Sequence, residues 1–284
     1  VGFRSLQENT TGTENTALGT ESGYYNTTGD GNTALGYRAY GRGSASNAST
    51  GDNNTAIGKF ALYSTQTASN NTAVGNSALQ ENTTGPSNTA VGYNAGTAIT
   101  TGGYNVAVGR QALMTTTTVN DNVAVGNNAL RLNVTGASNT AIGSSALDAN
   151  TTASNNTAVG AAALAANTTG TANTAVGSLA GDAVTTANDT SCFGYAAGGA
   201  VTTGHYNTCI GREAGVHTTS LTTGVGNTIL GSYAHTSAVD SNYANVIGHD
   251  VSGATNYTTL GNGTADIRAA HGNVTWATVS DERY

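Results

Sequence analysis

The chain has 284 residues, including 39 Gly but only 1 Pro, 3 Phe and 1 Trp, and 9% of its residues are charged. Large core-forming side chains are too scarce for an ordinary globule with one large core. The net charge of −7 with only nine Lys and Arg excludes nucleic acid as a partner, because that affinity depends on clustered cations. No apolar run approaches the roughly 18 to 20 residues of a membrane helix, so we expect no membrane insertion.

One short phrase recurs along the chain, as in residues 71–92, which read NTAVGNSALQENTTGPSNTAVG. The step between phrases is 17 residues, with an insertion of five before Gly58, an insertion of three before Gly231 and a last step of 13. Such a period predicts a stack of about sixteen coils. In chain order, the glycines that end the phrases are Gly2, Gly19, Gly36, Gly58, Gly75, Gly92, Gly109, Gly126, Gly143, Gly160, Gly177, Gly194, Gly211, Gly231, Gly248 and Gly261.

Each repeat contains an aliphatic phrase, an Ala-Leu pair such as Ala78-Leu79, and a turn such as Asn82-Thr83-Thr84-Gly85. The glycine in register predicts a turn, and the aliphatic phrase has the alternation of a short strand. We expect two short strands in every coil. Helical solenoids have units of 33 residues or more and use few Gly, Asn and Val, so the sequence predicts an all-β parallel β-solenoid.

Equivalent residues of successive coils would lie about 4.8 Å apart. One column is Asn in nearly every repeat, and we expect its amides to bond to one another along the stack. The members of this predicted ladder are Asn15, Asn32, Asn54, Asn71, Asn88, Asn105, Asn122, Asn139, Asn156 and Asn173.

The strand phrase places Thr or Val, then Ala, then a larger aliphatic residue in three consecutive columns. Alternation puts the first and third columns on one face and Ala on the other. We expect the larger column to fill the coil interior and the alanines to face a neighbouring chain. A thin coil with so few aromatic residues buries little apolar area, which also favours self-association.

The column after the phrase glycine is bulky and varied, and exposed Tyr and Arg are frequent anchors of binding patches. Together with the insertion at residues 41–51, it is the predicted contact surface for a sugar or a cell surface, although a solvated rim is the simpler interpretation. Its candidate residues are Tyr37, Arg42, Lys59, Tyr93, Arg110, Tyr195 and Arg212.

Other residue types carry weaker indications. Cys192 and Cys209 occupy one repeat position, and we expect them to be neighbours and reduced because in-register strands disfavour a disulfide geometry. The five histidines do not pair at ligand spacing and are expected to be exposed turn residues, so no metal or cofactor is predicted. The Asn-x-Ser/Thr sequons, Asn82 and Asn133 among them, are interpreted as turn chemistry rather than glycosylation.

The Asn-Thr-Ala-Val-Gly phrase resembles the head repeats of trimeric autotransporter adhesins, and the same type of repeat resembles the long tail fibres of bacteriophages. The resemblance spans Gly2 to Gly261 and implies a left-handed parallel β-roll in a three-chain assembly. Its implication for function is weaker, because a shared fold does not transfer a binding site.

The C-terminal residues 273–284 resemble the junction into the self-cleaving intramolecular chaperone domain of phage tail fibres. In that family a Ser–Lys pair cuts the chain. Ser280 matches the family's serine, and the matching Lys would follow Tyr284. The resemblance therefore implies a shaft over residues 1–261, a cap or connector over 262–279, and the start of a chaperone segment over 280–284. Since Val1-Gly2 is the tail of a phrase, we expect a fragment of a longer chain.

These features predict a noncatalytic, homotrimeric tail fibre of a virion that binds a host cell-surface glycan or protein and other fibre or tail subunits. The alternative is the head of a bacterial trimeric adhesin, located at the cell surface. An ice-binding solenoid is less favoured, because the phrase supplies one Thr per strand instead of a Thr-x-Thr row. A glycan-cutting enzyme would need a carboxylate pair between chains, and the repeat has no carboxylate column.

Overall fold

The computed structural model describes residues 1–41, 48–264, 266–272, 275 and 277–278. Within them the chain is all-β, without a helix, and forms a parallel β-solenoid of about 14 turns at a spacing of about 17 residues. The fold class expected from the sequence is confirmed, with fewer turns than the sixteen expected. The chain divides into two compact units, Val1–Ser144 (unit 1) and Ser145–Tyr284 (unit 2).

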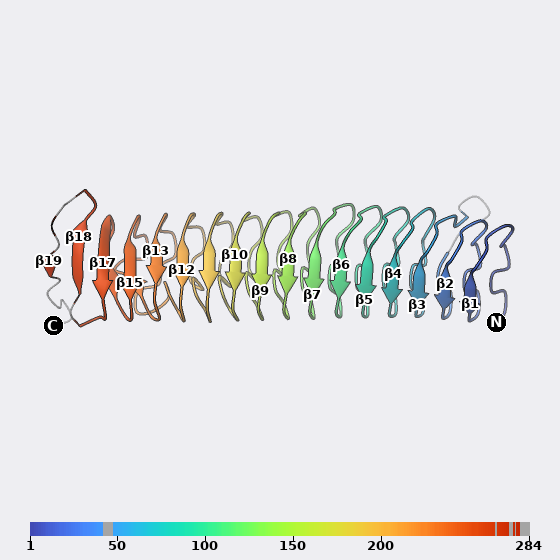
Figure 1. Ribbon diagram of the computed structural model, residues 1–284, viewed down its shortest axis with the longest axis horizontal. Coiled ribbons are helices and arrows are strands. Elements are labelled where there is room, and N and C mark those ends of the chain that lie inside the picture. Colours follow the sequence, from blue (N-terminus) through green and yellow to red (C-terminus); the bar gives the residue numbers. More distant parts are fainter. Residues whose placement is uncertain (42–47, 265, 273–274, 276, 279–284) are drawn as a thin grey trace. The chain divides into compact units, whose positions relative to one another are not determined.

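Unit 1 contributes one three-residue strand per turn, and each strand pairs in parallel with the strand of the next turn (Figure 1). The pairing of Thr33 with Thr55 shows that the five-residue insertion leaves the register intact. The strands are β1 (Thr16–Leu18), β2 (Thr33–Leu35), β3 (Thr55–Ile57), β4 (Thr72–Val74), β5 (Thr89–Val91), β6 (Val106–Val108), β7 (Val123–Val125) and β8 (Thr140–Ile142).

Unit 2 continues the same pattern and then ends it. Its parallel strands are β9 (Thr157–Val159), β10 (Thr174–Val176), β11 (Ser191–Phe193), β12 (Thr208–Ile210), β13 (Thr228–Leu230), β15 (Asn245–Gly248) and β17 (Tyr257–Gly261). The antiparallel strand β18 (Ile267–Ala270) covers β17, and β19 (Ala277–Thr278) pairs with β18. Two short strands, β14 (His235–Thr236) and β16 (Ser252–Gly253), form a separate parallel pair. Ser280 and the rest of 280–284 lie outside the described residues.

The expectation of two strands per coil is wrong for the turns of β1 to β12, which each contain one strand, whereas the described turns that follow β13 and β15 add the second short strands β14 and β16. The second segment of the other turns is the Asn-Thr-Thr-Gly turn, where the N–H groups of both threonines of one coil donate to a single threonine carbonyl of the next coil. The Thr83 backbone N–H and Oγ1 both donate to the Thr100 carbonyl, at 2.9 and 3.1 Å. One such residue per coil is too short to count as a strand.

The expected assignment of the interior is also wrong. The alanine column faces inward and the larger aliphatic column faces out: Ala34 is 3% exposed, whereas Leu35 beside it is 40% exposed. The reason is the thinness of the coil, because the inner face of the strand packs directly against the opposite turn. A Cβ added at Gly96, four residues after its phrase glycine, would lie 3.8 Å from the Ala90 Cβ. At that distance the inward position of the strand can hold the methyl group of an alanine but not the larger side chain of a valine.

The remaining core comes from residues that follow the strand. The Ala and Leu three and four positions after the phrase glycine are buried in six turns, as Ala78 and Leu79 show. Leu79 adopts a left-handed backbone with φ of 48°. We call this the Leu column. The phrase glycine itself is required by the stacking, because a Cβ at Gly75 would lie 2.5 Å from the Gly92 carbonyl oxygen.

The asparagines of the predicted ladder are buried, except for the half-buried Asn15, and they bond from turn to turn. The Asn105 Oδ1 accepts the backbone N–H of Asn122 at 3.1 Å, and the Asn105 Nδ2 donates to the Asn88 Oδ1 at 3.1 Å and to the Val119 carbonyl at 2.9 Å. Unit 2 extends the ladder to Asn207 and Asn227. Each amide therefore satisfies backbone groups of two adjacent coils that would otherwise be buried without a partner.

Candidate functional site

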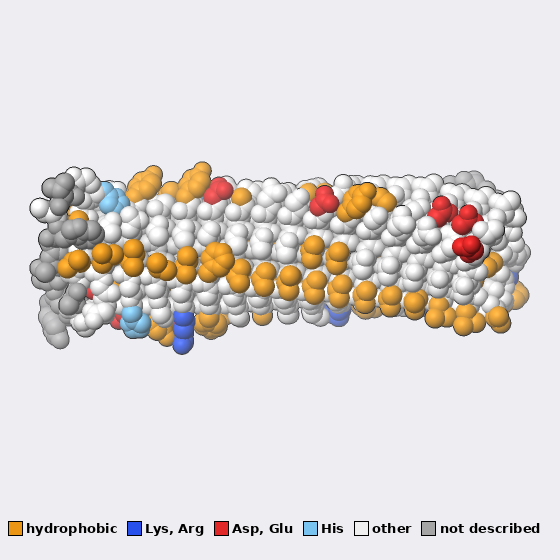
Figure 2. Space-filling model, in the orientation of Figure 1, with side chains coloured by type: hydrophobic (Ala, Val, Ile, Leu, Met, Phe, Trp, Pro, Cys, Tyr) orange, Lys and Arg blue, Asp and Glu red, His pale blue; other side chains and the backbone are white. Residues whose placement is uncertain are grey.

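The outward residues of the strands form an apolar stripe in each unit. Within each unit, Figure 2 shows a row of hydrophobic side chains that runs across the direction of the strands in Figure 1. Its third-column members include Leu18, Leu35, Val91, Ile142, Phe193, Ile210 and Leu230, which are all exposed. The first column holds Thr, Val or Ser, so neither outward column of β1–β13 contains a charged residue. We call these two columns the outer stripe.

The sequence-predicted contact residues do not form one cluster. In unit 1, the Tyr37 and Phe60 rings lie 5.7 Å apart, and the Lys59 Nζ lies 4.9 Å from the centre of the Phe60 ring. Tyr93 and Arg110 are exposed on later turns of the same column. Arg42 lies outside the described residues.

In unit 2 the predicted Tyr195 and Arg212 do meet, since the Arg212 Cζ lies 5.8 Å from the centre of the Tyr195 ring and 5.4 Å from that of Tyr233. The Tyr233 ring lies 5.0 Å from His217 and 5.8 Å from His249. The His217 Nε2 is 3.6 Å from Asp250 Oδ1. These residues form an aromatic ridge on the surface of unit 2.

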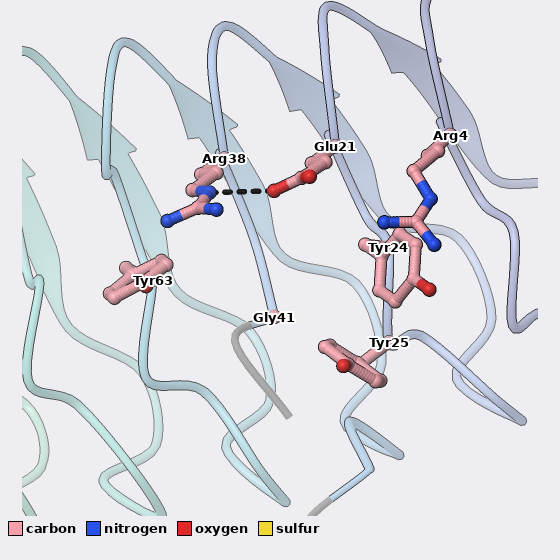
Figure 3. A pocket seen from close by; sticks show the side chains of 7 residues that line it. All are labelled: Arg4, Glu21, Tyr24, Tyr25, Arg38, Gly41 and Tyr63. Carbon is pink, nitrogen blue, oxygen red and sulfur yellow. Dashed lines mark hydrogen bonds and ion pairs between the residues drawn. The ribbon is translucent and has the colours of Figure 1, made fainter. Parts of the chain in front are cut away.

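A cavity of about 300 Å³ lies in unit 1, and we call it the tyrosine pocket (Figure 3). It is lined by Arg4, Glu21, Tyr24, Tyr25, Arg38, Gly41 and Tyr63. Arg4, Glu21 and Arg38 each lie two residues after a phrase glycine, on three successive turns, and all three have positive φ. Their side chains therefore lie in one column above the opening.

The tyrosines of the pocket belong to a second column, five residues after the phrase glycine. Tyr24, Gly41 and Tyr63 occupy that position on three successive turns. Gly41 therefore leaves an opening between two tyrosine side chains. Tyr25 lies beneath Tyr24, and their rings meet edge to face with centroids 4.4 Å apart.

Charges in the tyrosine pocket are partly paired. The Arg38 Nε donates to the Glu21 Oε2 at 2.6 Å, and this hydrogen bond raises the pKa of the Arg38 guanidinium. The Arg4 Nε donates to the Gln7 Oε1 at 3.0 Å, and its Cζ lies 5.2 Å from the centre of the Tyr24 ring. Desolvation raises the pKa of the Tyr24 phenol, the Arg4 charge acts in the opposite direction, and a hydrogen bond to the Glu8 carboxylate also raises it.

Sequence reasoning missed most of this site. It singled out Tyr37, whose ring centre lies 5.2 Å from the Arg38 Cζ, but not Arg4, Glu21, Tyr24 or Tyr63. The signal in the sequence is the position of each residue within its repeat. The second position after the phrase glycine reads Arg-Glu-Arg on three successive turns, and the fifth position reads Tyr-Gly-Tyr on three successive turns. Those columns become informative only when successive repeats are aligned as neighbours in space.

The expectation of exposed histidines is wrong for His235. This residue occupies the Leu column, which faces the interior, and it is buried. Its Nε2 lies 2.8 Å from the Thr218 Oγ1, and its Nδ1 lies 3.1 Å from the Tyr233 carbonyl oxygen. Its ring is also 5.8 Å from that of His217, so the repeat register brings these two histidines together.

The two cysteines are free, buried and paired in register across β11 and β12. The contact with Cys209 and burial both raise the pKa of the Cys192 thiol well above its usual range, so Cys192 is protonated at neutral pH. A protonated buried thiol is a poor nucleophile.

The sequon asparagines that were interpreted as turn residues are buried. The Asn82 Nδ2 donates to the Gly85 carbonyl at 2.9 Å, and its Oδ1 accepts the Gly85 N–H at 2.9 Å. Asn133 makes the same pair of bonds with Gly136. Both ends of each of these amides are therefore used within the turn, as the interpretation as turn chemistry expects.

Among the described residues, no group of three or more His, Cys, Asp and Glu side chains is placed to hold a metal ion. The same part of the chain contains no helix of sufficient length and hydropathy to cross a membrane. Comparison of the chain with family models, with curated proteins and with solved structures finds no match.

Proposed function

We propose that the chain is the shaft of a homotrimeric, noncatalytic attachment fibre of a phage virion, with a surface that contacts the host cell. The single observation that carries this proposal is the outer stripe. Thirteen strands, β1–β13, present apolar or hydroxyl side chains outward without one charge. An exposed apolar surface of this kind marks an interaction site in a soluble protein.

The period of the stripe supports copies of the same chain as its partner. A complementary surface must repeat at the strand spacing of about 4.8 Å over many turns, or most of its contacts fall out of register. Copies of this chain, lying side by side, have that period. The threefold number comes from the resemblance to adhesin heads and tail fibres, and shielding the stripe also adds the apolar burial that a thin coil lacks.

Two alternatives share the assembly or the fold. A bacterial adhesin head would use the same trimer, and it is distinguished by the gene: a coiled-coil stalk and a membrane barrel downstream favour the adhesin, whereas a chaperone domain favours the phage fibre. Ice binding is disfavoured by the stripe itself, which alternates Thr with Val, Leu or Ile instead of offering a flat Thr-x-Thr row.

The attachment function is tested with fluorescently labelled full chain on a panel of bacterial species. We expect saturable binding to one or a few species, competition by unlabelled chain, and loss of binding when surface glycans are removed by periodate oxidation. Glycan-independent binding would favour a protein receptor. Absence of saturable binding to any species in the panel would contradict the attachment role.

A further inference from the structure

The tyrosine pocket arises from a local exception in the repeat. In the fifth position after the phrase glycine, Gly41 separates Tyr24 and Tyr63, so the two phenol rings stand about two strand spacings, or about 10 Å, apart. Figure 3 shows Tyr63 on one side of Gly41 and Tyr24 with Tyr25 on the other. The aromatic side chains therefore stand on both sides of an opening, and none of them fills it.

The charges above the opening are not equivalent. Arg38 and Glu21 neutralise each other through a bond of 2.6 Å. Arg4 donates to the neutral Gln7, and among the described residues it has no carboxylate partner. In a chain with a net charge of −7, the pocket thus holds a cation without a paired anion, positioned above the Tyr24 ring.

This set of groups matches the chemistry of a charged sugar. The C–H face of a pyranose ring packs on an aromatic ring, whose π face is electron-rich. Sugar hydroxyls can donate to the Glu21 carboxylate and accept from the Arg38 guanidinium. A carboxylate on the sugar pairs with Arg4, because a guanidinium binds carboxylates through paired N–H donors. A volume of about 300 Å³ lies at the small end of ligand pockets and suits about one or two sugar rings.

Other ligand classes fit less well. A nucleic acid or polyphosphate needs several unpaired cations, and the pocket offers Arg4 alone. A lipid chain needs an apolar lining, whereas here guanidinium, carboxylate and phenol groups surround the opening. We propose that the tyrosine pocket binds an acidic saccharide, a sugar unit that carries a carboxylate. This proposal rests on the attachment function above and names its ligand class and its position in the chain.

The direct test is binding of the full chain to an array of oligosaccharides in which uronic-acid and sialic-acid glycans are matched with their carboxyl-reduced counterparts. We expect retention of some acidic glycans, with at least about tenfold weaker retention of the reduced partners, which corresponds to the loss of one charge-assisted contact. Equal retention of reduced partners, or no retention of any acidic glycan, would overturn the proposal.

Two variants locate the binding. Arg4→Gln should weaken binding of a retained acidic glycan by about tenfold while leaving the weak binding of its reduced counterpart unchanged. Tyr63→Ala should weaken both, because it removes one wall of the opening. Arg131→Gln is the matched control: it removes one charge in the column of Tyr24 and Tyr63, several turns away in unit 1. Unaltered binding by Arg4→Gln, with its circular dichroism and thermal unfolding unchanged, would contradict the assignment.

The two proposals fail differently. If the chain binds bacterial cells and the two pocket variants bind them equally well, the attachment function stands and the pocket assignment is wrong. If acidic glycans are retained through Arg4 but no cell is bound, the pocket stands and the attachment function is wrong.

Discussion

At the scale of single residues, the coil interior accepts two alternative side-chain combinations. Seven turns place Leu in the Leu column and Asn or Thr three residues later, as in Leu79 with Asn82. Other turns place Gly in the Leu column and a branched aliphatic residue later, as in Gly96 with Ile99. A Cβ at Gly96 would lie 3.0 Å from the Ile99 Cδ1, so the two side chains compete for one space.

This competition predicts a double-mutant result at Gly96 and Ile99. Gly96→Leu alone should destabilise the fold by about 1 to 3 kcal/mol through overpacking. Ile99→Asn alone should destabilise it by about 2 to 4 kcal/mol, because it removes a buried aliphatic group. Together they should cost at least about 1 kcal/mol less than the sum, measured by urea unfolding. Strict additivity would show that the two positions do not share a space.

Competition for space in the interior also explains why the middle residue of the strand is not Ala at Cys192, Cys209 and Ile229. A Cβ at Gly198 would contact the Cys192 Sγ, and one at Gly215 would lie 3.1 Å from the Cys209 Sγ and 3.5 Å from the Ile229 Cδ1. Glycine in the Leu column thus makes room for a larger inward residue. The expectation that the alanines face a neighbouring chain does not explain why these two positions change together.

Asp182 gives a pH-dependent prediction. Burial raises the pKa of its carboxyl group, with its own backbone N–H and that of Ala183 acting in the opposite direction. A raised folded-state pKa means that the ionised form destabilises the fold above that pKa, and that the cost disappears as pH falls below the unfolded value near 3.8. Asp182→Asn should therefore add a few tenths of a kcal/mol to the free energy of unfolding at pH 7, after solvent screening, and nothing at pH 3. A larger gain at pH 3 than at pH 7 would contradict this sign.

At the scale of elements, three-residue strands are too short to hold a sheet alone, and the asparagine ladder supplies the additional bonds between turns. Asn105→Ala would leave the Asn122 N–H and the Val119 carbonyl buried without their present partner. We expect a loss of about 2 to 4 kcal/mol in urea unfolding and faster hydrogen exchange at the Asn122 amide. The exposed Asn127→Ala should change the free energy of unfolding by less than about 0.5 kcal/mol. Equal effects of the two substitutions would contradict a structural ladder.

The sequence predicts these elements because they repeat. The 17-residue step, the turn glycine and the register across both insertions follow from spacing alone, as the pairing of Thr33 with Thr55 and of Thr208 with Thr228 confirms. The direction of the strand faces does not follow from spacing, because alternation fixes which residues share a face but not which face is inside. The decisive quantity is the thickness of the coil, which depends on the Leu column of the opposite turn.

For the tyrosine pocket, too, spacing alone does not determine the directions of the side chains. Alignment of the repeats places Tyr24, Gly41 and Tyr63 in one column, and this much is available from the sequence. Whether the gap at Gly41 is open depends on side-chain directions, because two tyrosines at this spacing can also close over the glycine. The edge-to-face contact of Tyr24 with Tyr25 keeps Tyr24 on its own side of the opening.

At the scale of the whole molecule, the central claim is that the outer stripe is an interface between copies of this chain. Val74→Asp combined with Val91→Asp places two charges in that stripe, on adjacent turns of unit 1. Thr84→Asp combined with Thr101→Asp adds the same charge at exposed turn positions outside the strands. Since all four side chains point outward, the fold of the single coil should survive in both variants.

Sedimentation equilibrium of the native chain and these two variants tests the claim most directly. We expect the native chain and the turn variant to have three times the 28.1 kDa mass of the chain, and the stripe variant to dissociate to a single chain at micromolar concentration. A native chain that sediments at 28.1 kDa, or a stripe variant that remains trimeric, would contradict the account.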